Sequence, residues 1–78
     1  MKVEILSPER TLFNGDVDLV TLPGTNGRFT ILQDHAPLVS SLRKGVIRIK
    51  PFEGDEIEIP VNGGFVEVKR NVVSVCVE

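Results

Sequence analysis

The chain has 78 residues, a formal net charge of −2, one cysteine and one histidine. A single cysteine excludes an intramolecular disulfide framework and fits a reducing compartment, and a single histidine excludes a multi-histidine metal site. The lack of a basic excess argues against nucleic acid as a partner, and no run approaches the ~18 apolar residues of a membrane-spanning helix. The length predicts one domain, residues 1–78.

Short strands separated by turn residues are predicted for the first part of the chain. Val3–Leu6 should end at Ser7-Pro8, because proline cannot donate a ladder hydrogen bond. Arg10–Phe13 is expected to be a short extended piece closed by Asn14-Gly15, a pair typical of type I′ turns. Asp16–Leu22 alternates polar and apolar residues with a period of two, which predicts a half-buried strand.

The segment Leu22–Leu38 combines two expected turns with a further strand. Pro23-Gly24 suits a type II turn and Asn26-Gly27 a type I′ turn, so the two together predict a stiff exposed knob. Phe29–Leu32 should then run inward as a strand and stop at a corner formed by Asp34–Pro37. The next segment, residues 38–42, fits a strand or one helical turn, and we favour the strand.

The spacing of charges and isoleucines predicts the pairing in the next hairpin. Opposite charges would meet on one face and isoleucines on the other, each charge pair contributing about 0.2–1 kcal/mol. The expected pairs are Lys50 with Glu56, Arg48 with Glu58, Ile49 with Ile57, and Ile47 with Ile59.

Two more hairpins are predicted after it. Gly63-Gly64 would close one that pairs Ile59 with Val68 and Glu58 with Lys69, and Arg70-Asn71 would close one that pairs Val68 with Val73 and Val66 with Val75. Pro60 fits poorly in a central strand and indicates an edge or a bulge. The whole pattern predicts an all-β fold, a flattened antiparallel β-sandwich or barrel of about eight to ten short strands.

Candidate catalytic and metal-binding residues are few. His35 is expected to be a structural corner residue bonded to backbone, and Cys76 a packed thiol. The carboxylates at 16, 18, 56 and 58 alternate along strands and are expected on solvated outer faces. We therefore expect no catalytic residue, no metal, no cofactor and no enzyme activity.

Four segments together resemble a known family. They are Leu22-Pro-Gly24, Gly27-x-Phe29-x-Ile-Leu32, His35-Ala-Pro-Leu38 and Gly63-Gly-Phe-Val-Glu-Val68. This pattern is similar to the N-terminal β-domain of the epsilon subunit of F-type ATP synthase, and the likeness extends over all 78 residues.

The resemblance implies a non-catalytic subunit of the central stalk. Such a subunit binds the gamma subunit and touches the polar loops of the c-subunit ring. It thereby couples proton or ion translocation to rotary ATP synthesis or hydrolysis in the alpha/beta head. The subunit itself is expected to interact with that head only indirectly. The expected location is the cytoplasmic face of a bacterial inner (plasma) membrane, peripheral, without direct membrane insertion.

Contact residues follow from the same resemblance. The expected rotor-ring contacts are Asn26 and Arg28; the expected gamma-subunit or ring contacts are Ser7, His35, Ala36, Pro37 and Leu38. Arg28 is basic where related sequences often carry an acid. We therefore expect this chain to bring a positive charge to the ring contact, where its relatives often bring a negative one. Gln33 stands where proline is common and is expected to loosen the corner slightly.

A further departure concerns the helical hairpin that usually follows this β-domain in the family. The chain ends at Glu78 without a helical pattern. If that is its natural length, we expect neither the helical brake on ATP hydrolysis nor an ATP site. Two other readings remain open at this stage: a generic β-sandwich interaction module, and a biotinyl or lipoyl carrier domain, for which Lys44 and Lys69 lie near turns but lack the usual flanking residues.

Overall fold

Eight strands and no helix make up the chain in a computed structural model that describes all 78 residues. The strands are β1 (Lys2–Leu6), β2 (Thr11–Gly24), β3 (Gly27–Leu32), β4 (Leu38–Leu42), β5 (Gly45–Pro51), β6 (Ile57–Val61), β7 (Gly64–Lys69) and β8 (Val72–Val77). This confirms the predicted all-β class and strand number. It also confirms a strand at residues 38–42.

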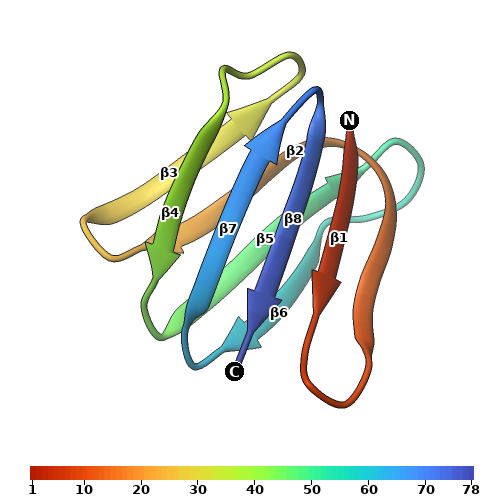
Figure 1. Cartoon of the computed structure of the whole chain (residues 1–78). Helices are drawn as coiled ribbons and strands as arrows, with labels where there is room; N and C mark the ends of the chain where they lie inside the picture. The colour runs from red at the N-terminus through yellow and green to blue at the C-terminus, as the bar shows by residue number, and fades with distance from the viewer.

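The strands form two layers that share the long strand β2. One layer contains β1, β8, β7 and β4, and the other contains β3, β2, β5 and β6 (Figure 1). The N-terminal half of β2 pairs with β1, and its C-terminal half pairs with β3 and β5. Every pairing is antiparallel except that of β1 with β8, which is parallel. The sandwich is therefore mixed, whereas the sequence predicted an antiparallel one.

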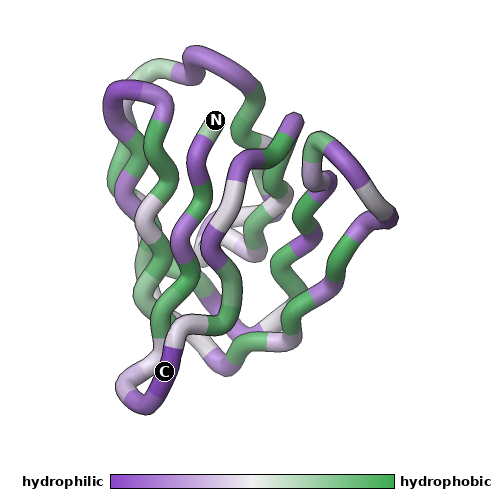
Figure 2. The backbone as a smooth tube through the Cα atoms, turned by 90° about the vertical axis from the view of Figure 1, so that its right-hand side faces the viewer, coloured by the Kyte–Doolittle hydropathy of each residue, from purple (hydrophilic) through white to green (hydrophobic).

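Between the layers lies a core made only of apolar side chains. Alternate residues of most strands are buried, and hydropathy alternates along the tube in Figure 2 in the same way. The largest fully buried side chains are Ile5, Leu22, Ile31, Ile47 and Ile49, together with Val3, Val17, Val20, Val66, Val68, Val73 and Val75. Fully burying one such side chain stabilises the fold by about 1.5–3 kcal/mol.

The expected turn at Asn14-Gly15 is wrong. Both residues lie within β2, where they pair with Glu4 and Val3 of β1. The hairpin instead turns earlier, where the Ser7 backbone N–H donates to the Arg10 carbonyl at 2.9 Å and the Arg10 N–H donates to Ser7 Oγ at 3.2 Å. Pairing along the whole of β1 outweighs the local turn preference of an Asn-Gly pair.

The turn at the knob is also displaced. Pro23 and Gly24 continue β2 and pair with Arg28 and Gly27, so no type II turn forms there. The two-residue connection is Thr25-Asn26, and neither residue has a positive φ, whereas Gly27 has φ +133°. Extending β2 to Gly24 allows it to pair with Leu42 of β4, which joins the two layers at this point.

Most of the β5–β6 register is confirmed. Arg48 pairs with Glu58, Ile47 with Ile59 and Ile49 with Ile57, and Arg48 Nε lies 2.9 Å from Glu58 Oε2. The pair of Lys50 with Glu56 is wrong, because β6 begins only at Ile57. Lys50 Nζ donates instead to the carbonyls of Pro51 and Gly54 in the connecting loop.

The two remaining hairpin predictions have opposite outcomes. Gly63-Gly64 closes no hairpin: β6 and β7 lie in different layers, and β7 pairs with β4 and β8. Arg70 and Asn71, at φ 53° and 63°, do close the β7–β8 hairpin in the predicted register. Pro60 lies in β6, which pairs only with β5, so its predicted edge position is confirmed.

Candidate functional site

The turns of the sandwich gather at two opposite ends, and these hold the predicted contact residues. The end that we call the knob end carries the connections at 7–10, 25–26, 43–44 and 62–63 and the C-terminus. The end that we call the corner end carries the N-terminus and the connections at 33–37, 52–56 and 70–71. In Figure 1 the knob-end connections lie at the bottom and, for the β2–β3 connection, at the far left, whereas the corner-end connections lie at the top and, for the β5–β6 connection, at the right.

Asn26 and Arg28 are both exposed at the knob end. The connection that carries Asn26 is fastened to β4, since Thr25 N donates to the Ser41 carbonyl at 3.1 Å and the two hydroxyls lie 2.6 Å apart. Arg28 pairs with Pro23, and its Nη2 donates to the Val46 carbonyl of β5 at 3.2 Å. The knob is thus held by contacts to both layers.

The corner formed by His35, Ala36, Pro37 and Leu38 lies at the other end. His35 is half-buried, and its Nδ1 lies 2.7 Å from the Ala36 carbonyl, to which it donates in the Nδ1-protonated tautomer. The predicted bond of this histidine to backbone is confirmed. Ala36 and Pro37 are exposed, and Leu38 packs against the core.

The seven predicted contact residues therefore do not form one patch. Ser7 follows β1, at the opposite edge of its layer from β4, to which the connection carrying Asn26 is fastened, and the His35 corner lies beyond the other end of β3. Six strand residues span roughly 20 Å. The knob and the corner are close in the sequence, but β3 between them carries the chain across the molecule.

A polar clasp that the sequence did not reveal holds the corner in place. Asn71 Oδ1 accepts from the Asp34 backbone N–H at 2.9 Å, and Asn71 Nδ2 donates to Gln33 Oε1 at 3.2 Å. Gln33 Nε2 donates in turn to the Val17 carbonyl at 3.1 Å, and the Met1 ammonium donates to Gln33 Oε1 at 3.1 Å. Gln33 was expected to loosen the corner, and it instead ties the corner to β2.

Replacing Asn71 by glycine should release this clasp while leaving the turn intact. Glycine accepts the observed φ of 63°, so the change removes the two side-chain hydrogen bonds, each contributing about 0.5–1.5 kcal/mol. We expect faster hydrogen exchange of the Asp34 amide and a lower midpoint of thermal unfolding. Arg70→Gly is the matched control, because Arg70 has φ 53° in the same turn and makes no side-chain hydrogen bond. Equal effects of the two changes would show that the clasp contributes nothing.

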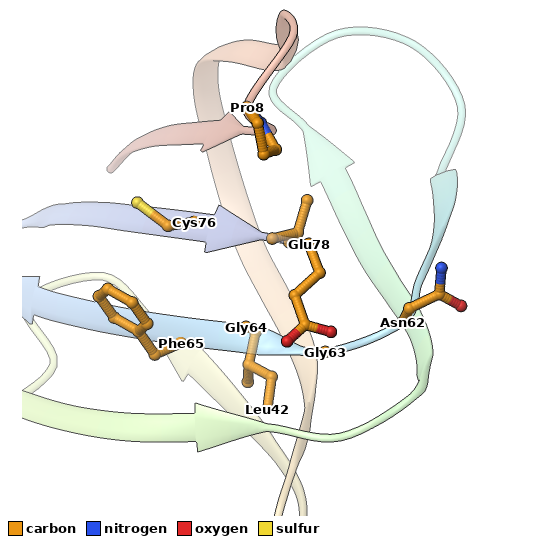
Figure 3. Close-up of a pocket in the computed structure, with 9 residues that line it drawn as sticks. Pro8, Leu42, Asn62, Gly63, Gly64, Phe65, Cys76 and Glu78 are labelled. Carbon is orange, nitrogen blue, oxygen red and sulfur yellow. The ribbon is translucent and has the colours of Figure 1, made fainter.

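The largest surface depression, of about 450 Å³, lies at the knob end (Figure 3). Its lining includes Pro8, Gly63, Phe65, Cys76 and Glu78. The packed thiol predicted at Cys76 is wrong: its side chain is exposed beside Phe65, which is 55% exposed. Cys76 is exposed because it lies on the outward face of β8, where it pairs with Phe65 of β7.

The arrangement of reactive groups offers no nucleophile–base pair. Cys76 is near the knob end and His35 is at the corner end, so the two cannot act together. No three His, Cys, Asp or Glu side chains gather as they would around a metal ion, and Asp16, Asp18, Glu56 and Glu58 are exposed as predicted. No helix of a length and apolarity that would cross a membrane occurs.

Comparisons with known proteins agree with the resemblance. Residues 1–78 match the family model described as "ATP synthase, Delta/Epsilon chain, beta-sandwich domain". The chain is 44% identical over 79 residues to the ATP synthase epsilon chain of Leptospira borgpetersenii serovar Hardjo-bovis, covering all of this chain and 61% of the relative. It is 45% identical over 75 residues to that of Carboxydothermus hydrogenoformans, covering 96% of this chain and 55% of the relative.

Solved structures share the fold. A chain of the central stalk/c-ring structure of Tetrahymena thermophila mitochondrial ATP synthase aligns with a TM-score of 0.83 at 19% identity, over 99% of this chain and 62% of its own length. A chain of the Euglena gracilis mitochondrial ATP synthase aligns with a TM-score of 0.86 at 19% identity, over 96% and 48%. The chain spans about three-fifths of the length of the curated relatives that it matches. On this evidence, the chain belongs to the ATP synthase delta/epsilon family and comprises that family's β-sandwich domain.

Proposed function

We propose that the chain acts in the central stalk of an F-type ATP synthase, where it attaches the gamma subunit to the membrane rotor ring. The observation that carries this proposal is the family match over residues 1–78, together with relatives named ATP synthase epsilon chain. Attachment of this kind needs a rigid body with two contact regions, and exposed turn residues on a tightly packed sandwich support this role. The chain transmits torque and so couples ion translocation to ATP synthesis or hydrolysis in the alpha/beta head, without bond chemistry of its own.

At the knob end, Asn26 and Arg28 face the polar loops of the c-subunit ring in this proposal. Both side chains are exposed, and the connection between β2 and β3 is fastened to Ser41 and Val46. Such pre-organisation lowers the entropy that is lost when a partner binds. A fixed polar turn is suited to a contact that must withstand torque.

Ser7 and the corner residues 35–38 contact the gamma subunit in this proposal. Because they lie at opposite ends, one partner that reaches both must extend along most of the domain, whose longest extent is 26 Å. The gamma contact is therefore a long strip rather than a small patch. The domain would act peripherally at the cytoplasmic face of a bacterial inner membrane, the kind of location that fits the bacterial relatives.

Three single variants test these contact residues. Arg28→Glu should weaken binding to the cognate c-ring about tenfold or more, because it replaces an attraction by a repulsion at an exposed contact.

Ser7→Ala and His35→Ala should weaken binding to purified gamma by about threefold to tenfold, as expected for loss of one hydrogen bond. Affinities measured by calorimetry check these changes, and thermal unfolding of each variant provides the control. If Ser7→Ala and His35→Ala lower only the unfolding temperature, these two residues serve the fold and do not contact gamma.

A further inference from the structure

Charges are separated along the chain. From Leu19 to Phe52 the chain carries five lysines and arginines and one acid, Asp34, whereas the rest carries four basic residues and ten acids. The basic part forms the end of β2 together with β3, β4 and β5. Figure 1 shows the ribbon of β3 and β4 on the side away from β1. The cations of this part lie on β3, on β5 and in the connection between β4 and β5, although the net charge of the chain is −2.

Three of these cations lie at the knob end beside two neighbouring connections: Arg28 follows the β2–β3 connection as the second residue of β3, and Arg43 and Lys44 form the β4–β5 connection. We call Arg28, Arg43 and Lys44 the basic pad. Pro23 joins the two connections: it pairs with Arg28 across β2 and β3, and its carbonyl accepts from the Arg43 backbone N–H at 2.9 Å. Gly45, next to Lys44, packs so closely that a Cβ there would lie 2.8 Å from Pro23 Cβ. The pad is therefore built on a fixed backbone.

No acid within the chain neutralises the pad. All three residues are exposed, and the single ion pair of the chain joins Arg48 to Glu58. The Arg28 guanidinium donates only to the Val46 carbonyl. Carboxylates at this end belong to other connections and form no ion pair with the pad. Like charges held close together on a fixed surface repel one another, and a partner that brings carboxylates relieves that repulsion.

We propose that the basic pad docks a carboxylate-bearing loop of the rotor ring, so that Arg43 and Lys44 extend the ring contact of the knob. The inference rests on the proposed function of the knob. Guanidinium groups bind carboxylates through two parallel hydrogen bonds, which gives direction as well as attraction. Three cations are fewer than the four to eight that hold proteins on anionic lipid, so the chemistry favours an acidic polypeptide over the membrane surface.

The test uses charge reversal at two places on the full chain. Arg43→Glu with Lys44→Glu changes the pad, and Lys2→Glu with Lys69→Glu is the matched control, with the same change in net charge on exposed residues near the corner end. The probe is the cognate c-ring in detergent. In about 0.1 M salt the pad variant should raise the Kd about tenfold and the control about twofold or less, and the difference should shrink in about 1 M salt, where screening is strong.

The outcomes separate the inference from the proposed function. If the original chain binds the ring and the two double variants weaken it equally, or neither weakens it, the pad is not part of the contact. If the pad variant loses binding to phosphatidylglycerol vesicles while ring binding is unchanged, the pad serves lipid and the inference is wrong. If the original chain does not bind the ring at all, the proposed ring contact itself fails. The single variants Arg43→Glu and Lys44→Glu, each expected to raise the Kd about threefold, confirm that the effect comes from both side chains.

Discussion

Replacing Gly64 by alanine should remove about half or more of the free energy of unfolding of this domain. Gly64 has φ +145° and is the first residue of β7, which lies between β4 and β8. It pairs with Leu42 of β4 and with Val77 of β8. A Cβ there would collide with the Cys76 carbonyl oxygen and lie 2.9 Å from Val77 Cα, both of them backbone atoms that cannot move aside alone. The strained φ costs about 1–3 kcal/mol and the collision at least as much again. A domain of this size has only about 4–12 kcal/mol of stability.

Gly27→Ala is the matched control for this prediction. Gly27 has φ +133°, a similar backbone conformation, but no atom lies within 4 Å of the position that a Cβ would take. Its replacement should therefore show only the cost of the backbone strain, about 1–3 kcal/mol. Urea unfolding followed by far-ultraviolet circular dichroism measures both variants. Equal losses of stability for the two would show that the close approach at Gly64 is unimportant.

The sequence predicted pairings where charge and burial agree on one register. Arg48 with Glu58 and Ile47 with Ile59 are correct because a slip of one residue would turn the two isoleucines away from the core. The β7–β8 hairpin is correct because Arg70 and Asn71 adopt the positive φ of a tight turn. Local chemistry was sufficient in both cases.

Predictions of turns failed where pairing with another strand kept the residues in an extended conformation. Asn14-Gly15 and Pro23-Gly24 have the composition of turns, yet β1 and β4 offer them backbone partners, and both stay in β2. Gly63-Gly64 resembles a hairpin turn, but here the two positive φ values carry the chain from one layer to the other. Sequential strands pair in only roughly two-thirds of cases, and this connection is one of the others.

The site was predictable in its parts and not in its arrangement. The exposed knob at Asn26 and Arg28 and the bonded corner at His35 follow from the sequence. Their placement at opposite ends does not, nor does the clasp, since Asp34 and Asn71 are 37 residues apart. The basic pad joins connections that only the fold brings together, although the acid-poor run from Leu19 to Phe52 could have drawn attention to it.

In the proposed role the domain is a mechanical link between two partners. Two contact regions on one rigid sandwich would make the second contact intramolecular once the first has formed. A chain with both contacts should therefore raise retention of gamma on the ring by far more than either contact alone. The closed apolar core and the fastened ends provide the rigidity that this requires.

The mechanical link can be tested by measuring how much gamma is retained by immobilised c-ring. Purified cognate gamma is passed over the ring with and without the chain, in about 0.1 M salt, and the bound gamma is quantified. If the domain links the two partners, at least about tenfold more gamma should be retained when the chain is present. The ring should then hold the chain and gamma in equal amounts. Gamma retention that is the same in both conditions, with no chain on the ring, would contradict the account.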